Sequence, residues 1–109
     1  RAAIAGTGSE EFLALLRNEL EYRYEDVGFH LKYAEALAAR GDERSAAVEA
    51  RLMLVQDPYH FAGNLLLAQC YLHLGLAADC EKVCDEYLAV AGYCFEFQEL
   101  REQARQQRE

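Results

Sequence analysis

Apolar residues recur at spacings of three and four along almost the whole chain, which is the periodicity of amphipathic helices. Breakers interrupt this pattern at Gly41, Pro58, Gly75 and Gly92. Glycine adopts the left-handed conformation that ends many helices, and the residue before a proline is disfavoured in the helical region. The pattern therefore predicts an all-α protein of about six helices joined by short turns.

The same pattern predicts a single domain over residues 1–109, with no long linker between its helices. At this length the chain buries roughly two-thirds of its unfolded surface, and its 52% apolar content is ample for a core. The expected parts are a lead-in at 1–8, an N-terminal helix or half repeat at 9–26, a first unit at 27–58, a second unit at 59–92, and a capping helix at 93–109.

Small polar residues stand where these helices are expected to begin. Thr7 with Glu10 has the spacing of a capping box, and Ser9 alone fits a simple N-cap. Asp26 and Asp42 are placed to cap the two helices of the first unit. The lead-in before them is either a frayed start or the last turn of an earlier helix.

The two central units repeat each other. Gly41 and Gly75, which are expected to end the first helix of each unit, lie 34 positions apart. The matches fall at turns, at small packing positions and on apolar faces, where a repeat requires them. The other identical pairs at this spacing are Leu31 with Leu65, Ala34 with Ala68, and Leu54 with Leu88.

A 34-residue period of paired helices is typical of the tetratricopeptide repeat, and the sequence resembles that family over 27–92. Ala34 and Ala68 match the small residue in the middle of the first helix, Ala46 the early alanine of the second, and Pro58 the terminal proline. The resemblance implies a right-handed superhelical α-solenoid of antiparallel helix hairpins.

The repeats are divergent. His30 and Asn64 stand where the family usually has tryptophan. Cys80, Cys84 and Tyr87 replace the alanine, aromatic and alanine of the second helix.

In this family the first helices of successive units line a concave groove that binds polypeptides. The resemblance gives no support to a carboxylate clamp, because Leu31, Glu35, Ala62 and Leu66 stand at the positions of its basic and amide residues. An apolar segment suits such a groove better. The residues that the resemblance places in the groove are Leu31, Glu35, Ala38, Leu65, Gln69, Leu72 and His73.

We therefore predict a non-catalytic module that binds a protein or peptide segment, such as an adaptor, chaperone or assembly factor. The alternative is a self-association module, in which the half repeat or the aromatic patch at 93–97 is covered by a second copy. No phosphate-binding loop, nucleophile elbow or metalloprotease motif is present, so we do not expect an enzyme.

The net charge and the hydropathy of the chain bear on nucleic acid and the membrane as partners. The net charge of −8 disfavours nucleic acid as a partner, because an acidic surface repels phosphate backbones. No run of 18 apolar residues exists, so no membrane-spanning segment is expected.

The four cysteines are the only candidates for metal or redox chemistry. Cys80 and Cys84 are four residues apart on one predicted helix, so they share a face, and Cys70 and Cys94 could complete a tetrahedral site. Core packing is the favoured interpretation, with a disulfide or a metal site as alternatives. Unpaired cysteines would suit a reducing compartment such as the cytoplasm, and we expect no cofactor.

Overall fold

The computed structural model describes residues 10–23 and 27–109, and in these ranges it contains six helices and no strand. The all-α class and the six helices are thus confirmed. The lead-in at 1–8 and the capping residues Thr7, Ser9 and Asp26 lie outside the described residues. The helices are α1 (Glu10–Arg23), α2 (Val27–Ala39), α3 (Glu43–Gln56), α4 (Phe61–His73), α5 (Ala77–Ala91) and α6 (Phe95–Arg108).

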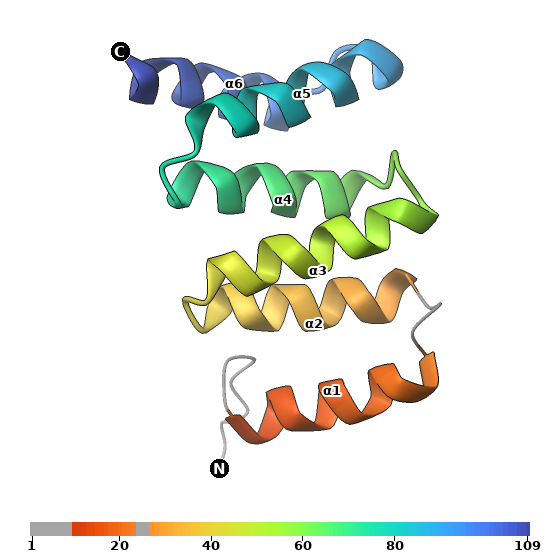
Figure 1. Cartoon of the computed structure of the whole chain (residues 1–109). Helices are drawn as coiled ribbons and strands as arrows, with labels where there is room; N and C mark the ends of the chain where they lie inside the picture. The colour runs from red at the N-terminus through yellow and green to blue at the C-terminus, as the bar shows by residue number, and fades with distance from the viewer. Residues whose placement is uncertain (1–9, 24–26) are drawn as a thin grey trace.

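Consecutive helices run in opposite directions and stack in chain order from α1 to α6 (Figure 1). Each helix packs on the next one. In addition α2 contacts α4, and α4 contacts α6, across an intervening helix. These contacts place α2, α4 and α6 in one row, and α3 and α5 on the other side of the stack.

The turns after α2 and α4 have the same geometry. Gly41 and Gly75 have φ angles of +96° and +82°, a conformation that an L-residue adopts only with strain. The amides of Gly41 and Asp42 donate to the carbonyls of Ala38 and Leu37, which is the Schellman pattern of a helix C-terminus. The amides of Gly75 and Leu76 donate in the same pattern, so the 34-residue repeat has a physical counterpart in the backbone.

The caps that begin the next helices differ between the units. Asp42 accepts a hydrogen bond from the amide of Ser45 at 3.2 Å, as expected of an N-cap. Leu76 stands at the equivalent position before α5 and makes no side-chain cap. At the other end of α3, the helix stops at Gln56, just before Asp57 and Pro58, as the sequence predicts.

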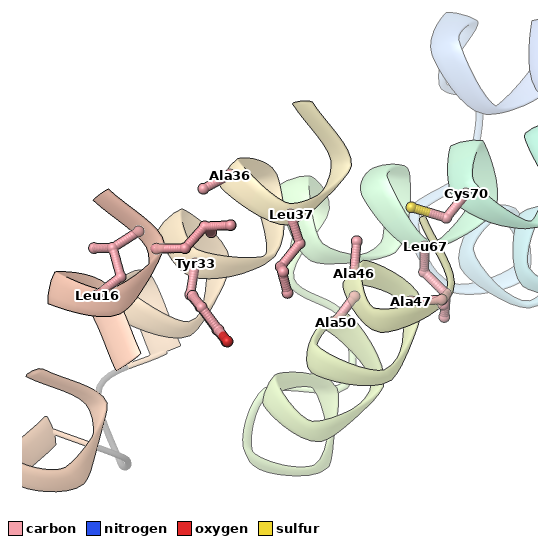
Figure 2. Close-up of a cluster of buried hydrophobic side chains, with 10 residues drawn as sticks. Leu16, Tyr33, Ala36, Leu37, Ala46, Ala47, Ala50, Leu67 and Cys70 are labelled. Atoms are coloured by element: carbon pink, nitrogen blue, oxygen red, sulfur yellow. The ribbon is translucent and has the colours of Figure 1, made fainter. Parts of the chain in front are cut away.

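Small residues let α2 and α3 approach closely in the first of two core clusters, which joins α1 to α4 (Figure 2). Ala46 and Ala50 are fully buried, and Leu37 lies between them and Tyr33. A bulky residue at either alanine would force the two helices apart. This cluster therefore depends on small residues as much as on large ones.

The second core cluster joins α4, α5 and α6 and is organised around an aromatic group. Phe97 is fully buried and its ring stacks on Tyr87, with a centroid separation of 4.2 Å. Phe61 meets Phe97 edge-on at 5.8 Å. These rings fix α6 against the end of α5 and the start of α4.

Two polar residues, Asn64 of α4 and His30 of α2, are buried. Asn64 is buried and donates from Nδ2 to the carbonyls of Pro58 and His60, at 3.0 and 2.9 Å. His30 is also buried, and its Nδ1 lies 3.3 Å from Oε1 of Glu49. Asn64 thus holds the turn before α4.

Ion pairs fix α6 along the outside of α5. Arg101 donates to Asp85 at 2.9 Å, and Arg108 and Arg105 both contact Glu81. Phe97 and Leu100 bury the opposite side of α6. Within the described ranges, none of the helices has the length and apolar character that crossing a membrane requires.

Candidate interaction surfaces

A hollow of about 360 Å³ opens between α2, α4 and the start of α3. This α2–α4 hollow is lined by four of the residues that were predicted to form a groove. They come from two helices that lie a full unit apart in the chain, and the fold brings them together. The lining residues are Glu35, Ala38, Ala39, Glu43, Leu66, Gln69 and His73.

The α2–α4 hollow has an apolar base and an acidic rim. Leu66 and the two alanines supply the apolar part, while Glu35 is exposed and makes no ion pair with any residue that the structure describes. Glu43 Oε1 lies 2.8 Å from Nδ1 of His73. Glu43 thus has an imidazole beside it, whereas the carboxylate of Glu35 is exposed and has no such neighbour among the described residues.

The other three predicted groove residues lie outside this hollow. Leu72 is buried in the second core cluster, and Leu65 packs against the same cluster. Leu31 is half-buried and does not line the hollow. The floor is formed by Leu66 instead, which lies three and seven residues before Gln69 and His73 and so shares their face of α4.

A second hollowed region, which the sequence did not lead us to expect, runs between α3 and α5, with α4 as its floor. Three adjoining hollows of about 210, 250 and 510 Å³ form this α3–α5 furrow. All three are lined by Glu86. The residues of the furrow from α3 and the following turn are Arg51, Leu54, Val55, Pro58 and Tyr59, those from α4 are Asn64, Leu67 and Tyr71, and those from α5 are Asp79, Lys82, Val83, Glu86, Tyr87, Ala89 and Val90.

The rims of the α3–α5 furrow carry exposed apolar side chains. Val55 is 78% exposed, and Tyr59 and Val90 are more than half exposed. Val48 and Leu52 continue the row on α3, at spacings of four and three that put all three α3 residues on one face. Five exposed apolar side chains thus lie in the furrow or on the same face of α3 beside it.

Both signs of charge line the furrow. Arg51 donates to the hydroxyl of Tyr71 at 3.2 Å. Within the described part of the chain, none of the side chains of Arg51, Lys82, Asp79 and Glu86 forms an ion pair. The furrow is therefore charge-balanced, in contrast to the acidic hollow.

The signal for the furrow was present in the sequence. The α3 segment has two apolar faces: one is the buried face of Ala46, Ala50 and Met53, and the other consists of Val48 and Val55 with Leu52 between them. The second stripe exceeds what one core-facing helix needs.

The cysteines mostly fill the core. Cys80 and Cys84 are fully buried in the second cluster, whereas Cys70 is buried in the first. Burial raises the pKa of the Cys70 thiol to about 11, so that thiol stays protonated at neutral pH. Cys94 is half-buried, and its Sγ donates to Glu96 at 3.3 Å.

All four cysteines are free. Among the residues with a described position, no three or more His, Cys, Asp or Glu side chains come together in a way that could bind a metal ion.

The described histidines have structural partners. His60 Nδ1 accepts a hydrogen bond from the amide of Gly63 and so caps α4, while His30 lies beside Glu49 and His73 beside Glu43.

The chain matches no family model, no curated protein and no solved structure in comparisons with known proteins. The resemblance to the tetratricopeptide repeat therefore stays a prediction.

Proposed function

We propose that this chain is a non-catalytic interaction module of the tetratricopeptide type, a right-handed superhelical α-solenoid that binds a polypeptide segment at the α2–α4 hollow. The observation that carries the proposal is that Glu35, Ala38, Gln69 and His73 line one hollow, although they lie on helices of different repeats. A groove built from successive repeats is the usual binding surface of solenoids.

The chemistry of the hollow favours a segment with a basic side chain between apolar ones. The stem of an arginine or lysine packs on apolar surface, and its charged head reaches the rim. Glu35 and Glu43 lie at that rim. A hydrogen bond to a charged group contributes about 1.5–3 kcal/mol, which is roughly a ten- to hundredfold change in affinity.

A reducing compartment such as the cytoplasm suits this module. All four cysteines are free, and three of them pack in the core as small apolar residues. The fold therefore does not depend on a disulfide for its stability, as is usual for proteins of reducing compartments.

The test is binding of a short synthetic peptide of leucine, alanine and arginine, followed by fluorescence anisotropy. A peptide of the same length in which glutamate replaces arginine is the ligand control. We expect the wild-type protein to bind the arginine peptide at least about tenfold more tightly than the glutamate peptide, because the rim is acidic.

The matched protein control is a second charge reversal far from the hollow. Glu35→Lys should abolish the preference for arginine, whereas Glu99→Lys, at an exposed position on α6, should keep it. Helicity by circular dichroism should be unchanged in both variants. Equal affinity of the wild-type protein for the two peptides would contradict the proposal.

A further inference from the structure

We propose that the α3–α5 furrow is the contact surface for a second copy of this chain, with α3 of each copy lying in the furrow of the other. This dimer is independent of the polypeptide-binding function, because it uses the opposite side of the stack and leaves the α2–α4 hollow open.

The shape allows α3 to act both as a rim and as an inserted element. The furrow lies beside α3, and Val55 and Arg51 of that helix line it. The exposed stripe that continues from Val55 through Leu52 to Val48 projects from the same helix. A two-fold axis near α3 therefore brings the stripe of each copy to the furrow of the other, which is the self-matching that an isologous interface requires.

Burial of the apolar residues provides the driving force. Val48, Leu52 and Val55 are each more than half exposed, and Tyr59 and Val90 lie along the same furrow. The hollow at the Tyr59 end has a volume of about 510 Å³, enough for several aliphatic side chains of a partner. Covering this surface removes from water the largest exposed apolar groups of α3.

The charges of the furrow make it compatible with a second copy of this acidic chain. The whole chain has a net charge of −8, so most approaches of one copy to another bring acidic surface against acidic surface. The furrow is an exception, because Arg51 and Lys82 are balanced by Asp79 and Glu86. None of the four is neutralised by an ion pair in the part of the chain that the structure describes.

In a two-fold symmetric dimer, every contact between these charges occurs twice. Arg51 lies on α3 between the stripe residues Val48 and Val55, so it enters the furrow of the other copy together with them. Glu86 lines every one of the three hollows of that furrow. Arg51 of each copy thus meets Glu86 of the other, and the pair occurs twice per dimer.

The experiment is a charge-swap mixture studied by light scattering after gel filtration, in reducing buffer and over a wide range of concentrations. The wild-type protein is expected at twice its monomer mass of 12.4 kDa. Arg51→Glu and Glu86→Arg alone are each expected at the monomer mass, because each places like charges across both contacts. An equimolar mixture of the two variants is expected to form a heterodimer, in which every contact again joins opposite charges.

The control is Lys32→Glu, a charge reversal at an exposed position on α2, which should leave the dimer intact. Circular dichroism of all variants separates loss of the dimer from loss of the fold. A wild-type protein that stays monomeric at every concentration would overturn the proposal. Single variants that still dimerise would also overturn it, because the contact would then not depend on Arg51 and Glu86. Folded single variants whose mixture stays monomeric would overturn it as well, because Arg51 and Glu86 would then not pair between the two copies.

Discussion

The α2–α4 hollow and the α3–α5 furrow lie on different sides of the same helices and have opposite electrostatic character. The hollow has Glu35 and Glu43 at its rim, with His73 beside one of them. The furrow has two cations and two anions, and its rims are apolar. An acidic surface repels a second copy of an acidic chain, whereas a balanced apolar surface accepts one. This difference between the two surfaces is the reason that we propose different partners for them.

One helix serves both surfaces. Glu43 in the first turn of α3 lines the hollow, while Arg51 and Val55 line the furrow. Between them Ala46 and Ala50 fix α3 in the core with no exposed surface. Changes at different positions of α3 should therefore separate the two functions without unfolding the protein.

The largest expected effect is loss of the aromatic support at one end of the furrow. Phe97→Ala removes a fully buried ring that stacks on Tyr87, and Tyr87 lines the furrow. We expect the free energy of unfolding in urea to fall by about 3–5 kcal/mol. Phe95→Ala, two residues away and 59% exposed, is the matched control and should change it by less than about 0.5 kcal/mol.

A smaller loss of stability is expected where α3 and α4 approach closely. A Cβ at Gly63 would lie 3.1 Å from the terminal carbon of Met53 and 3.2 Å from a methyl carbon of Leu54. Gly63→Val should therefore push α3 away and lower the free energy of unfolding by about 1–3 kcal/mol. Because α3 contributes to both surfaces, this variant should weaken dimerisation and peptide binding together. Loss of dimerisation alone, or of peptide binding alone, would show that the two surfaces do not both depend on the position of α3.

Removal of a single rim charge should affect only the hollow. Glu43→Gln keeps the size of the side chain and its contact with His73 but removes the carboxylate charge. Affinity for the arginine peptide should fall by roughly tenfold, or about 1.4 kcal/mol, with no change in the mass of the dimer. The fall should shrink as salt is added, since screening weakens exposed charge interactions. A loss that is equal at low and high salt would indicate that the carboxylate acts through packing instead.

The smallest change in stability is expected at an exposed rim residue of the furrow, where a substitution should still weaken dimerisation. Val55→Ser alters a side chain that is 78% exposed, so the free energy of unfolding of the monomer should change by less than about 0.5 kcal/mol. Dimerisation should nevertheless weaken, because Val55 is at the centre of the proposed contact. Leu15→Ser, at a 64% exposed position on α1, is the control and should leave the dimer unchanged. Equal effects of the two substitutions on assembly would argue against the furrow.

Much of the fold could be predicted because it depends on local rules. Gly41, Gly75 and Gly92 have positive φ angles and follow helices, and Pro58 follows the end of α3, as the breakers predicted. Asp42 caps α3 as expected. Such features are set by a few neighbouring residues, so a single sequence is enough to find them.

The surfaces were harder to predict because they depend on which helix face meets a neighbour. Leu65 and Leu66 are adjacent, yet Leu66 lines the hollow while Leu65 packs against the second core cluster. Leu72 lies on the core side as well. Periodicity shows that both faces of α4 are apolar, but only the crossing of α4 over α2 and α5 decides which face stays open. The furrow was missed for the same reason, because the sequence shows the apolar stripe on α3 but not that α5 lies opposite it.

We propose that the two surfaces act independently, one on a peptide and one on a second copy. The most direct measurement is the mass of the protein by light scattering, with and without a saturating amount of the arginine peptide. We predict a dimer in both cases, with one peptide bound per chain in the second. A monomer without peptide would contradict the proposed dimer. A dimer that dissociates when the peptide binds would contradict the independence of the two surfaces, because the peptide and the second copy would then share one surface.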